Sequence, residues 1–233
     1  KNKMDAQKLL KELEDAGTAQ NRKIYARHGV GEKMFGVSFK ILRQKQKECK
    51  GEDELALALW KTGYHEARLL AAMIADPKKM DAETAELWAQ DLQNYVQTDE
   101  FSSLIGKTSF VQEKMEAWTL SDKEWVGRAG WHLLANIAQH DDVLPDEYFL
   151  AYLARIENEI HQRKNRVRDG MNNALIAIGI RNPELTEKAK VVAEKIGKVE
   201  VDHGQTSCKT PDAVGYIEKT LAYRKKKESK KRR

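Results

Sequence analysis

Cysteine and proline are both scarce in this chain, which holds two cysteines and four prolines in 233 residues. The cysteines, Cys49 and Cys208, are far apart in the sequence, so they indicate two reduced thiols and not a disulfide framework. A chain of this length can bury a core, as one domain or two, without disulfides or a metal. Three of the four prolines follow residues that typically cap helices, as in Asn182-Pro183, which indicates that they mark helix starts.

Long apolar runs are also absent. The longest, such as Leu69–Ala75 and Ala174–Ile180, are far shorter than the roughly 18 to 20 residues of a membrane-spanning helix. No basic-then-apolar signal peptide opens the chain. We therefore expect a soluble, cytoplasmic protein that does not bind a membrane.

The formal net charge of +5 is concentrated at one end of the chain. Arg224–Arg233 contains eight Lys or Arg and one acid, a local balance of +7, so the other 223 residues sum to −2. A terminal block of like charges is typical of a solvated, disordered tail. We predict a single folded domain over residues 1–223 and a basic disordered tail at 224–233. Binding to a polyanion then depends on local patches of the folded part.

Apolar residues recur at intervals of three and four along almost the whole chain, and no run alternates as a strand would. This pattern predicts an all-α protein. Ser121 with Glu124 matches a capping box and predicts a helix start there. The predicted helices cover residues 4–16, 18–27, 38–49, 53–61, 64–75, 81–96, 110–118, 121–139, 145–162, 165–181, 183–196 and 211–224.

Weak internal similarity favours a repeat architecture over a globular bundle. At an offset of 40 residues, Arg128, Gly130 and Trp131 align with Arg168, Gly170 and Met171. This offset is near the period of HEAT and armadillo repeats, whose stacked helix pairs bury a continuous core. We predict an α-α superhelix of such repeats, a C-shaped solenoid with one concave face.

Two further segments are candidates for function. The irregular segment Gly197–Thr210 is either a functional loop or a simple strap between the last two helices. The basic run from His161 to Arg168 lies where two predicted helices meet and suits phosphate oxygens, although a solvated turn would have the same composition. From this run we predict that Lys164, Arg166 and Arg168 contact DNA.

No motif predicts a cofactor. The six histidines and two cysteines lack paired metal-ligand spacing, and His203 with Cys208 alone would make a poor site. The chain also lacks a phosphate-binding glycine loop and a nucleophile elbow. We expect neither a metal nor an organic cofactor.

Two segments resemble a known family. Ile24–Val30 with Phe35–Val37 is similar to the N-terminal signature of the AlkD-like HEAT-repeat glycosylases, the bacterial DNA alkylation-repair family. Ser121–Ala129 is similar to that family's mid-chain helix, in which an arginine follows a tryptophan by three residues. The resemblance implies an α-helical solenoid that grips duplex DNA and hydrolyses the N-glycosidic bond of cationic alkylated purines without the usual base flipping.

The resemblance also implies which side chains would act. The family uses a Trp and an Asp four residues apart, a second Trp, a Tyr near the N-terminus and an Arg on a phosphate; Tyr25 and Arg128 match the last two. A carboxylate near the sugar would stabilise the developing oxocarbenium ion and orient water, and indole faces would attract the cationic base.

Three of the implied positions differ in this sequence. Phe101 takes the place of the first Trp, Ile105 that of the Asp, and Met171 that of the second Trp. The matched arginine, Arg128, comes three residues before Trp131, so the two side chains lie on the same helical face. We expect the binding cleft to be lined by Tyr25, Phe101, Trp131 and Met171.

Two functions therefore stay open for a protein that we expect to be a monomer binding damaged or distorted duplex DNA. The first is a DNA glycosylase in which Asp99 or Glu100, the nearest acids in the sequence, supplies the carboxylate. The second is a catalytically silent repeat scaffold that binds protein partners or unusual DNA structures.

Overall fold

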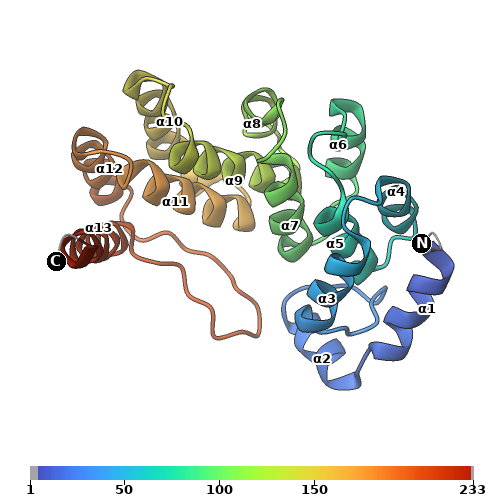
Figure 1. Cartoon of the computed structure of the whole chain (residues 1–233). Helices are drawn as coiled ribbons and strands as arrows, with labels where there is room; N and C mark the ends of the chain where they lie inside the picture. The colour runs from blue at the N-terminus through green and yellow to red at the C-terminus, as the bar shows by residue number, and fades with distance from the viewer. Residues whose placement is uncertain (1–4, 232–233) are drawn as a thin grey trace. The chain divides into compact units, whose positions relative to one another are not determined.

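A computed structural model describes residues 5–231, and every regular element in this range is helical (Figure 1). Thirteen α-helices and one short 3-10 helix occur there, with no β-strand, which confirms the all-α prediction. The helices are α1 (Ala6–Ala16), α2 (Ala19–Arg27), α3 (Phe39–Cys49), α4 (Asp53–Lys61), α5 (His65–Ile74), α6 (Ala82–Gln90), α7 (Tyr95–Ile105), α8 (Val111–Trp118), α9 (Glu124–His140), α10 (Asp146–Glu159), η1 (Ile160–Gln162), α11 (Asn165–Gly179), α12 (Pro183–Ile196) and α13 (Ala213–Lys231).

The described chain divides into two compact units, and the single domain over residues 1–223 stays a prediction. The first unit contains residues 5–113 and 203–207, and the second contains residues 114–202 and 208–231. The boundary falls inside α8, with no proline-rich or glycine-rich linker to mark it in the sequence. Neither the composition nor the period of the chain could therefore reveal it.

Each unit has two layers of helices (Figure 1). In the first unit α5 contacts α3 and α7, while α4 packs on α5 and α6 on α7. All ten residues of α5 are buried, so this helix is the core of the first unit. In the second unit α11 contacts α9 and α13, and α10 and α12 pack against α11 and each other.

The glycines of the internal repeat are points of close helix contact in the second unit. A Cβ on Gly130 of α9 would lie 2.4 Å from the backbone nitrogen of Thr119, and one on Gly170 of α11 would lie 3.4 Å from the Cβ of Trp131. Trp131 and Met171, which follow these glycines, have no exposed surface. The similarity at an offset of 40 thus marks the positions where α9 packs on the end of α8 and where α11 packs on α9.

Polar caps decide several helix boundaries. Asn182 accepts a hydrogen bond from the amide of Leu185 before Pro183, as its sequence context predicts. Asn94 caps α7 by accepting from the amide of Gln97, so the predicted helix 81–96 ends at Gln90 and a new one begins at Tyr95. The predicted start of a helix at Ser121 is wrong, because α9 begins at Glu124 and Lys123 is its N-cap.

The basic C-terminal segment is helical where the sequence predicted a disordered tail. Helix α13 continues to Lys231, and the last two residues lie outside the described part of the chain. Ile217 is fully buried on this helix, and Arg224 donates to the carbonyl oxygen of Ile180 at 3.0 Å. These contacts hold the first half of α13 on α11, and the helix can then propagate through residues with good helix propensity.

The segment before α13 is irregular, as predicted, from Gly197 to Asp212. Asn165 at the start of α11 holds it with two hydrogen bonds, to the carbonyl oxygen (2.8 Å) and from the amide (2.7 Å) of Asp202. Both cysteines are free thiols, as predicted, with Cys49 buried and Cys208 exposed. Between residues 5 and 231 no helix is long and apolar enough to cross a bilayer.

The glycine contacts predict that alanine lowers the free energy of unfolding at position 130 but not at position 170. Gly130→Ala should lower the free energy of unfolding by about 2 kcal/mol, because its Cβ would overlap backbone that cannot move aside. Gly170→Ala should be neutral or stabilise by up to about 1 kcal/mol, because its Cβ meets ordinary contacts and alanine favours the helix. Urea unfolding followed by circular dichroism measures both, and equal losses would contradict this packing.

Candidate nucleic-acid interface

Arg128, predicted to bind a phosphate, is buried between α9 and α11. Its side chain keeps 4% of its surface exposed, and Nη1 donates to Oδ2 of Asp169 at 2.6 Å and to the carbonyl oxygen of Arg166 at 3.1 Å. A guanidinium held this way joins two helices and has little surface left for a phosphate. We therefore regard Arg128 as a structural residue.

The predicted basic run at the start of α11 is only partly exposed. Lys164, the N-cap residue, is exposed, Arg168 is half-buried, and Arg166 keeps 9% of its surface. The backbone amide of Arg166 donates to Oε1 of Glu124 at 2.8 Å, so a carboxylate already occupies part of this helix N-terminus. Lys164 and Arg168 are the members of the run that can reach a phosphate.

Trp131 and Met171, predicted to line a cleft, are core residues. Both have no exposed surface, because their side chains fill the contact between α9 and its neighbours. The Trp131 ring meets Tyr152 edge-on with ring centroids 6.0 Å apart, and the guanidinium of Arg155 lies 5.1 Å from its centroid. These contacts stabilise the second unit and leave no indole face for a base.

Phe101 on α7 is likewise a core residue and not a cleft residue. Its ring is fully buried and lies 6.0 Å from the ring of Trp60, centroid to centroid. Ile105, one turn later, is also fully buried. The face of α7 at which the resemblance implies a Trp and an Asp is therefore apolar and packed.

Asp99 and Glu100, the predicted carboxylates, are both half-buried on α7. At about 100° per residue, Glu100 lies about 100° around the helix from Phe101, and Asp99 lies nearly opposite it. Oε1 of Glu100 is 4.0 Å from Nη2 of Arg43 on α3. Burial raises the pKa of Glu100, and the nearby guanidinium only partly offsets that effect.

Tyr25 on α2 lies in a polar cluster of the first unit. Its hydroxyl donates to the carbonyl oxygen of Val37, and burial raises its pKa. Its ring meets His65 edge-on at 5.6 Å between centroids. His65 is 1% exposed, and burial lowers its pKa to about 4, so this imidazole is neutral at pH 7.

Glu66 fixes the loop that the Tyr25 hydroxyl contacts. This fully buried carboxylate accepts hydrogen bonds from three consecutive amides, those of Phe35 (2.9 Å), Gly36 (2.6 Å) and Val37 (3.0 Å). Gly36 has φ +82° and its Cβ would lie 2.5 Å from the carbonyl oxygen of Thr18, so only glycine fits there. The matched signature thus encodes a clamped loop that orients Tyr25.

A basic helix face that was not predicted from the sequence lies on α3, in the same unit as Tyr25. Residues 19–50 contain nine Lys or Arg and two acids, a balance of +7. Within this range Lys40, Arg43 and Lys47 on α3 are all exposed, and their spacing of three and four residues puts them on one face. Charge counted in windows along the chain, and not only at its terminus, would have identified this face.

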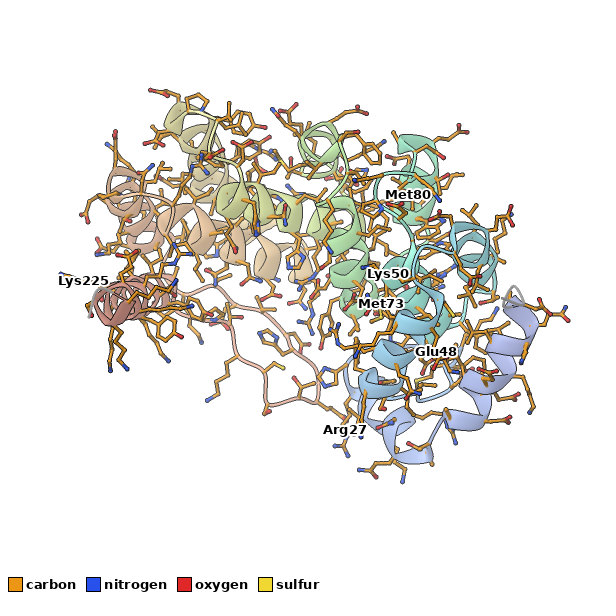
Figure 2. All side chains as sticks on the ribbon, in the orientation of Figure 1. Arg27, Glu48, Lys50, Met73, Met80 and Lys225 are labelled. Carbon is orange, nitrogen blue, oxygen red and sulfur yellow. The ribbon has the colours of Figure 1, made fainter. Side chains whose placement is uncertain are left out.

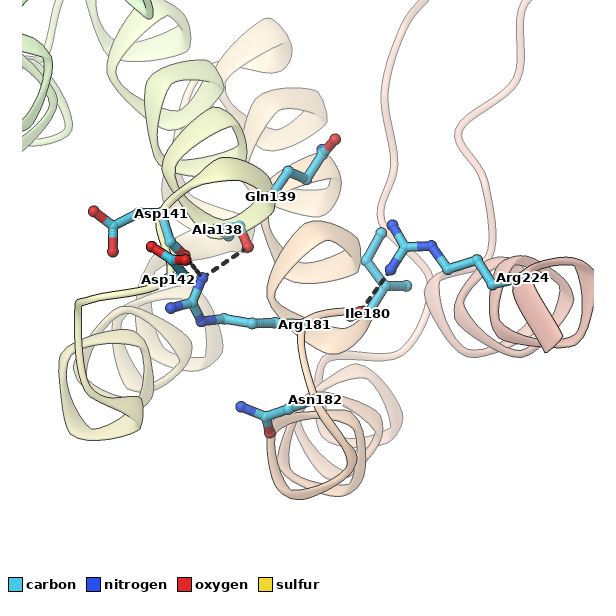
Figure 3. A pocket seen from close by; sticks show the side chains of 8 residues that line it. All are labelled: Ala138, Gln139, Asp141, Asp142, Ile180, Arg181, Asn182 and Arg224. Atoms are coloured by element: carbon cyan, nitrogen blue, oxygen red, sulfur yellow. Dashed lines mark hydrogen bonds between the residues drawn. The ribbon is translucent and has the colours of Figure 1, made fainter. Parts of the chain in front are cut away.

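A pocket of about 330 Å³ in the second unit lies where three helices meet (Figure 3). Arg181 donates to carbonyl oxygens at the end of α9, those of Ala138 (3.1 Å) and Asp141, and Arg224 donates to that of Ile180 after α11. Both guanidinium groups therefore cap helix C-termini. The lining residues are Ala138, Gln139, Asp141, Asp142, Ile180, Arg181, Asn182 and Arg224.

Comparison with known proteins identifies the family. The family model described as DNA alkylation repair enzyme matches residues 6–211. The chain belongs to this family. It is also 30% identical over 221 residues to the uncharacterized proteins Lin0241 of Listeria innocua and Lmo0209 of Listeria monocytogenes, an alignment that covers 90% of this chain and 93% of each relative.

The chain is similar to a solved structure from a new family of proteins related to the HEAT-like repeat DNA glycosylases with affinity for branched DNA structures. The TM-score is 0.85 at 28% identity, and the alignment covers 94% of this chain and 95% of that one. This likeness confirms the predicted HEAT-like repeat fold.

As a member of the DNA alkylation repair enzyme family, the chain keeps the family scaffold with an altered set of side chains. Tyr25 and its clamped loop are present, whereas apolar core residues stand at the implied Trp and Asp positions. No group of three His, Cys, Asp or Glu between residues 5 and 231 could hold a metal ion.

The burial of Arg128 predicts a loss of stability where the sequence predicted a loss of DNA contact. Arg128→Ala should lower the free energy of unfolding by about 3 kcal/mol, because it leaves Asp169 buried without its cation. Lys164→Ala should change it by less than about 0.5 kcal/mol, because that side chain is exposed. Urea unfolding of both variants is the measurement; unchanged stability in Arg128→Ala would restore its phosphate-binding interpretation.

Proposed function

We propose that this protein binds DNA through the phosphate backbone, prefers branched or otherwise distorted DNA, and does not excise bases. The observation that carries the proposal is Ile105. A fully buried isoleucine stands where the resemblance implies the carboxylate that stabilises the sugar cation. Without that charge on α7, hydrolysis lacks its main electrostatic contribution.

The neighbouring acids are poor replacements for the missing carboxylate. Asp99 points away from the face of Phe101 and Ile105, as the helical period requires. Glu100 is turned toward Arg43, and burial raises its pKa, which disfavours the ionised form that a developing cation would need. The glycosylase hypothesis therefore has little support from this geometry.

Exposed cations support binding to the DNA backbone. The first unit has the α3 face, defined as Lys40, Arg43 and Lys47, and the second unit has Lys164 and Arg168 at the start of α11. Cations spaced along helix faces neutralise successive phosphates and release counterions, which yields affinity without reading sequence. The affinity of the similar solved protein for branched DNA structures supports a preference for such substrates here.

The alternative function, a scaffold for protein partners, would require a different kind of surface. Large contiguous patches of exposed apolar surface mark sites of interaction with other proteins. The large exposed apolar side chains between residues 5 and 231 are scattered over several helices and loops: Leu57, Leu87, Leu120, Val143, Val191, Tyr216 and Tyr223. This distribution favours a polyanion over a protein partner.

Removing the α3 face tests the proposal. The triple variant Lys40→Ala/Arg43→Ala/Lys47→Ala should bind a four-way DNA junction at least about tenfold more weakly than the wild type in 100 mM salt. The slope of log affinity against log salt should fall by roughly 0.9 for each phosphate contact removed. Fluorescence anisotropy with labelled DNA measures both quantities.

A charge-matched control separates a specific face from net charge. Lys61→Ala/Lys78→Ala/Lys79→Ala removes the same charge from exposed positions that do not share one helix face, so it should retain most of the affinity. Wild-type protein should also bind the junction more tightly than a linear duplex of equal length. Equal losses in both triple variants, or no preference for the junction, would contradict the proposal.

A further inference from the structure

Helix α13 carries a face that combines aromatic rings with positive charge. With 3.6 residues per turn, Tyr216, Tyr223 and four lysines fall within an arc of about 100°. The acids of this helix, Glu218 and Glu228, lie outside that arc. The four lysines are Lys219, Lys226, Lys227 and Lys230, and with the two tyrosines they make up what we call the tyrosine-lysine face.

The packing of α13 turns this face to solvent. Ile217 is fully buried, with its Cδ1 against Gly179 of α11, where a Cβ would lie only 2.5 Å away. Glu218 pairs with Lys190 of α12 at 3.3 Å, and Arg224 bonds the carbonyl oxygen of Ile180. These three anchors fix the rotation of the first half of the helix, so Tyr216 and Lys219 lie outside the core, while residues 222–231 are exposed on every side.

Both tyrosines are unusually exposed for aromatic residues. Tyr216 keeps 51% and Tyr223 67% of its surface, and no other aromatic residue in the range 5–231 is among the large exposed side chains. Figure 2 draws the side chains of α13 as sticks and labels Lys225, which lies outside the tyrosine-lysine face. Unlike the other large exposed apolar side chains, these two rings share one helix face with several lysines.

We propose that the tyrosine-lysine face of α13 binds unpaired bases of DNA, the tyrosine rings stacking on bases while the lysines contact the flanking phosphates. This inference rests on the proposed function and names the feature of branched DNA that is recognised. Aromatic rings stack on any base, and neighbouring lysines follow the backbone, which together give structure-dependent and sequence-tolerant binding.

The spacing of the rings fits a short unpaired stretch. Tyr216 and Tyr223 are two helical turns apart, about 10 Å along the axis, which is close to the rise of three stacked nucleotides at 3.4 Å each. A fully paired duplex hides the faces of its internal bases, so along its length it offers this surface phosphates alone. Junctions, gaps and ends expose base faces and should bind more tightly.

The chemistry of the face disfavours an anionic membrane as its ligand. Membrane-surface helices place Leu, Phe or Trp side chains on the face that enters the lipid, beneath their cationic flanks. The outward arc of α13 has none of these, and its one leucine, Leu221, is half-buried on the packed side. Tyrosine with lysine suits a stacked and charged ligand better.

The test compares two DNA molecules that differ only in unpaired bases: a duplex with a three-nucleotide gap spanned by single-stranded DNA, and the same duplex fully paired. Tyr216→Ala/Tyr223→Ala should weaken binding to the gapped duplex at least about tenfold and leave the paired duplex within about twofold. Tyr216→Phe/Tyr223→Phe should retain both affinities. With 2-aminopurine in the single strand, wild-type binding should quench its fluorescence through stacking, and the alanine variant should not.

The controls make each outcome decisive. Leu87→Ala/Leu120→Ala removes exposed apolar side chains from other parts of the chain and should change neither affinity. If the alanine variant of α13 binds the gapped duplex like the wild type, the inference is wrong while DNA binding by the protein stands. If the wild type binds neither DNA, both proposals fail. Binding to phosphatidylserine vesicles, with no preference for the gap, would overturn the inference.

Discussion

The buried ion pair between Arg128 and Asp169 is the interaction on which the second unit depends. It joins α9 to α11 where Gly170 meets Trp131 and the backbone of Arg128, and there Trp131 and Met171 fill the core. Charges taken out of water are costly unless they are paired and hydrogen-bonded, so this pair makes one register of the two helices strongly preferred. The glycines, the core residues and the ion pair therefore all contribute to the packing of the second unit.

The positions at which the resemblance implies catalysis are buried in this protein, and the exposed charge lies elsewhere. Residues at positions where the resemblance implies chemistry, such as Phe101, Ile105 and Met171, stabilise the core, while the surfaces of α3 and α13 carry the exposed charge. A HEAT-like scaffold can tolerate this change because its stability comes from contacts between neighbouring helices and not from the binding surface. The proposals follow from this division: binding by surface cations and exposed rings, with no carboxylate for hydrolysis.

Much of the fold could be predicted from the sequence, because helical period and caps are local signals. The bounds of Asp53–Lys61 and Pro183–Ile196 are confirmed as predicted. The predicted helix 81–96 was wrong because its period continues through Asn94, whose capping bond to Gln97 starts a new helix. Long-range facts were not available: Asp169 lies 41 residues from Arg128, so the burial of this arginine could not be read locally. The candidate site was predicted less well than the fold, because the exposure of a side chain depends on contacts between distant residues.

Base excision tests the central claim most directly, the claim that this scaffold binds DNA without hydrolysing it. Purified protein is mixed in molar excess with methylated duplex DNA, and the release of 3-methyladenine and 7-methylguanine is measured over time. An active alkylpurine glycosylase is the positive control. With Ile105 buried where a carboxylate would act, we predict release no faster than spontaneous depurination, although the DNA is bound. Protein-dependent release well above that background would contradict the account.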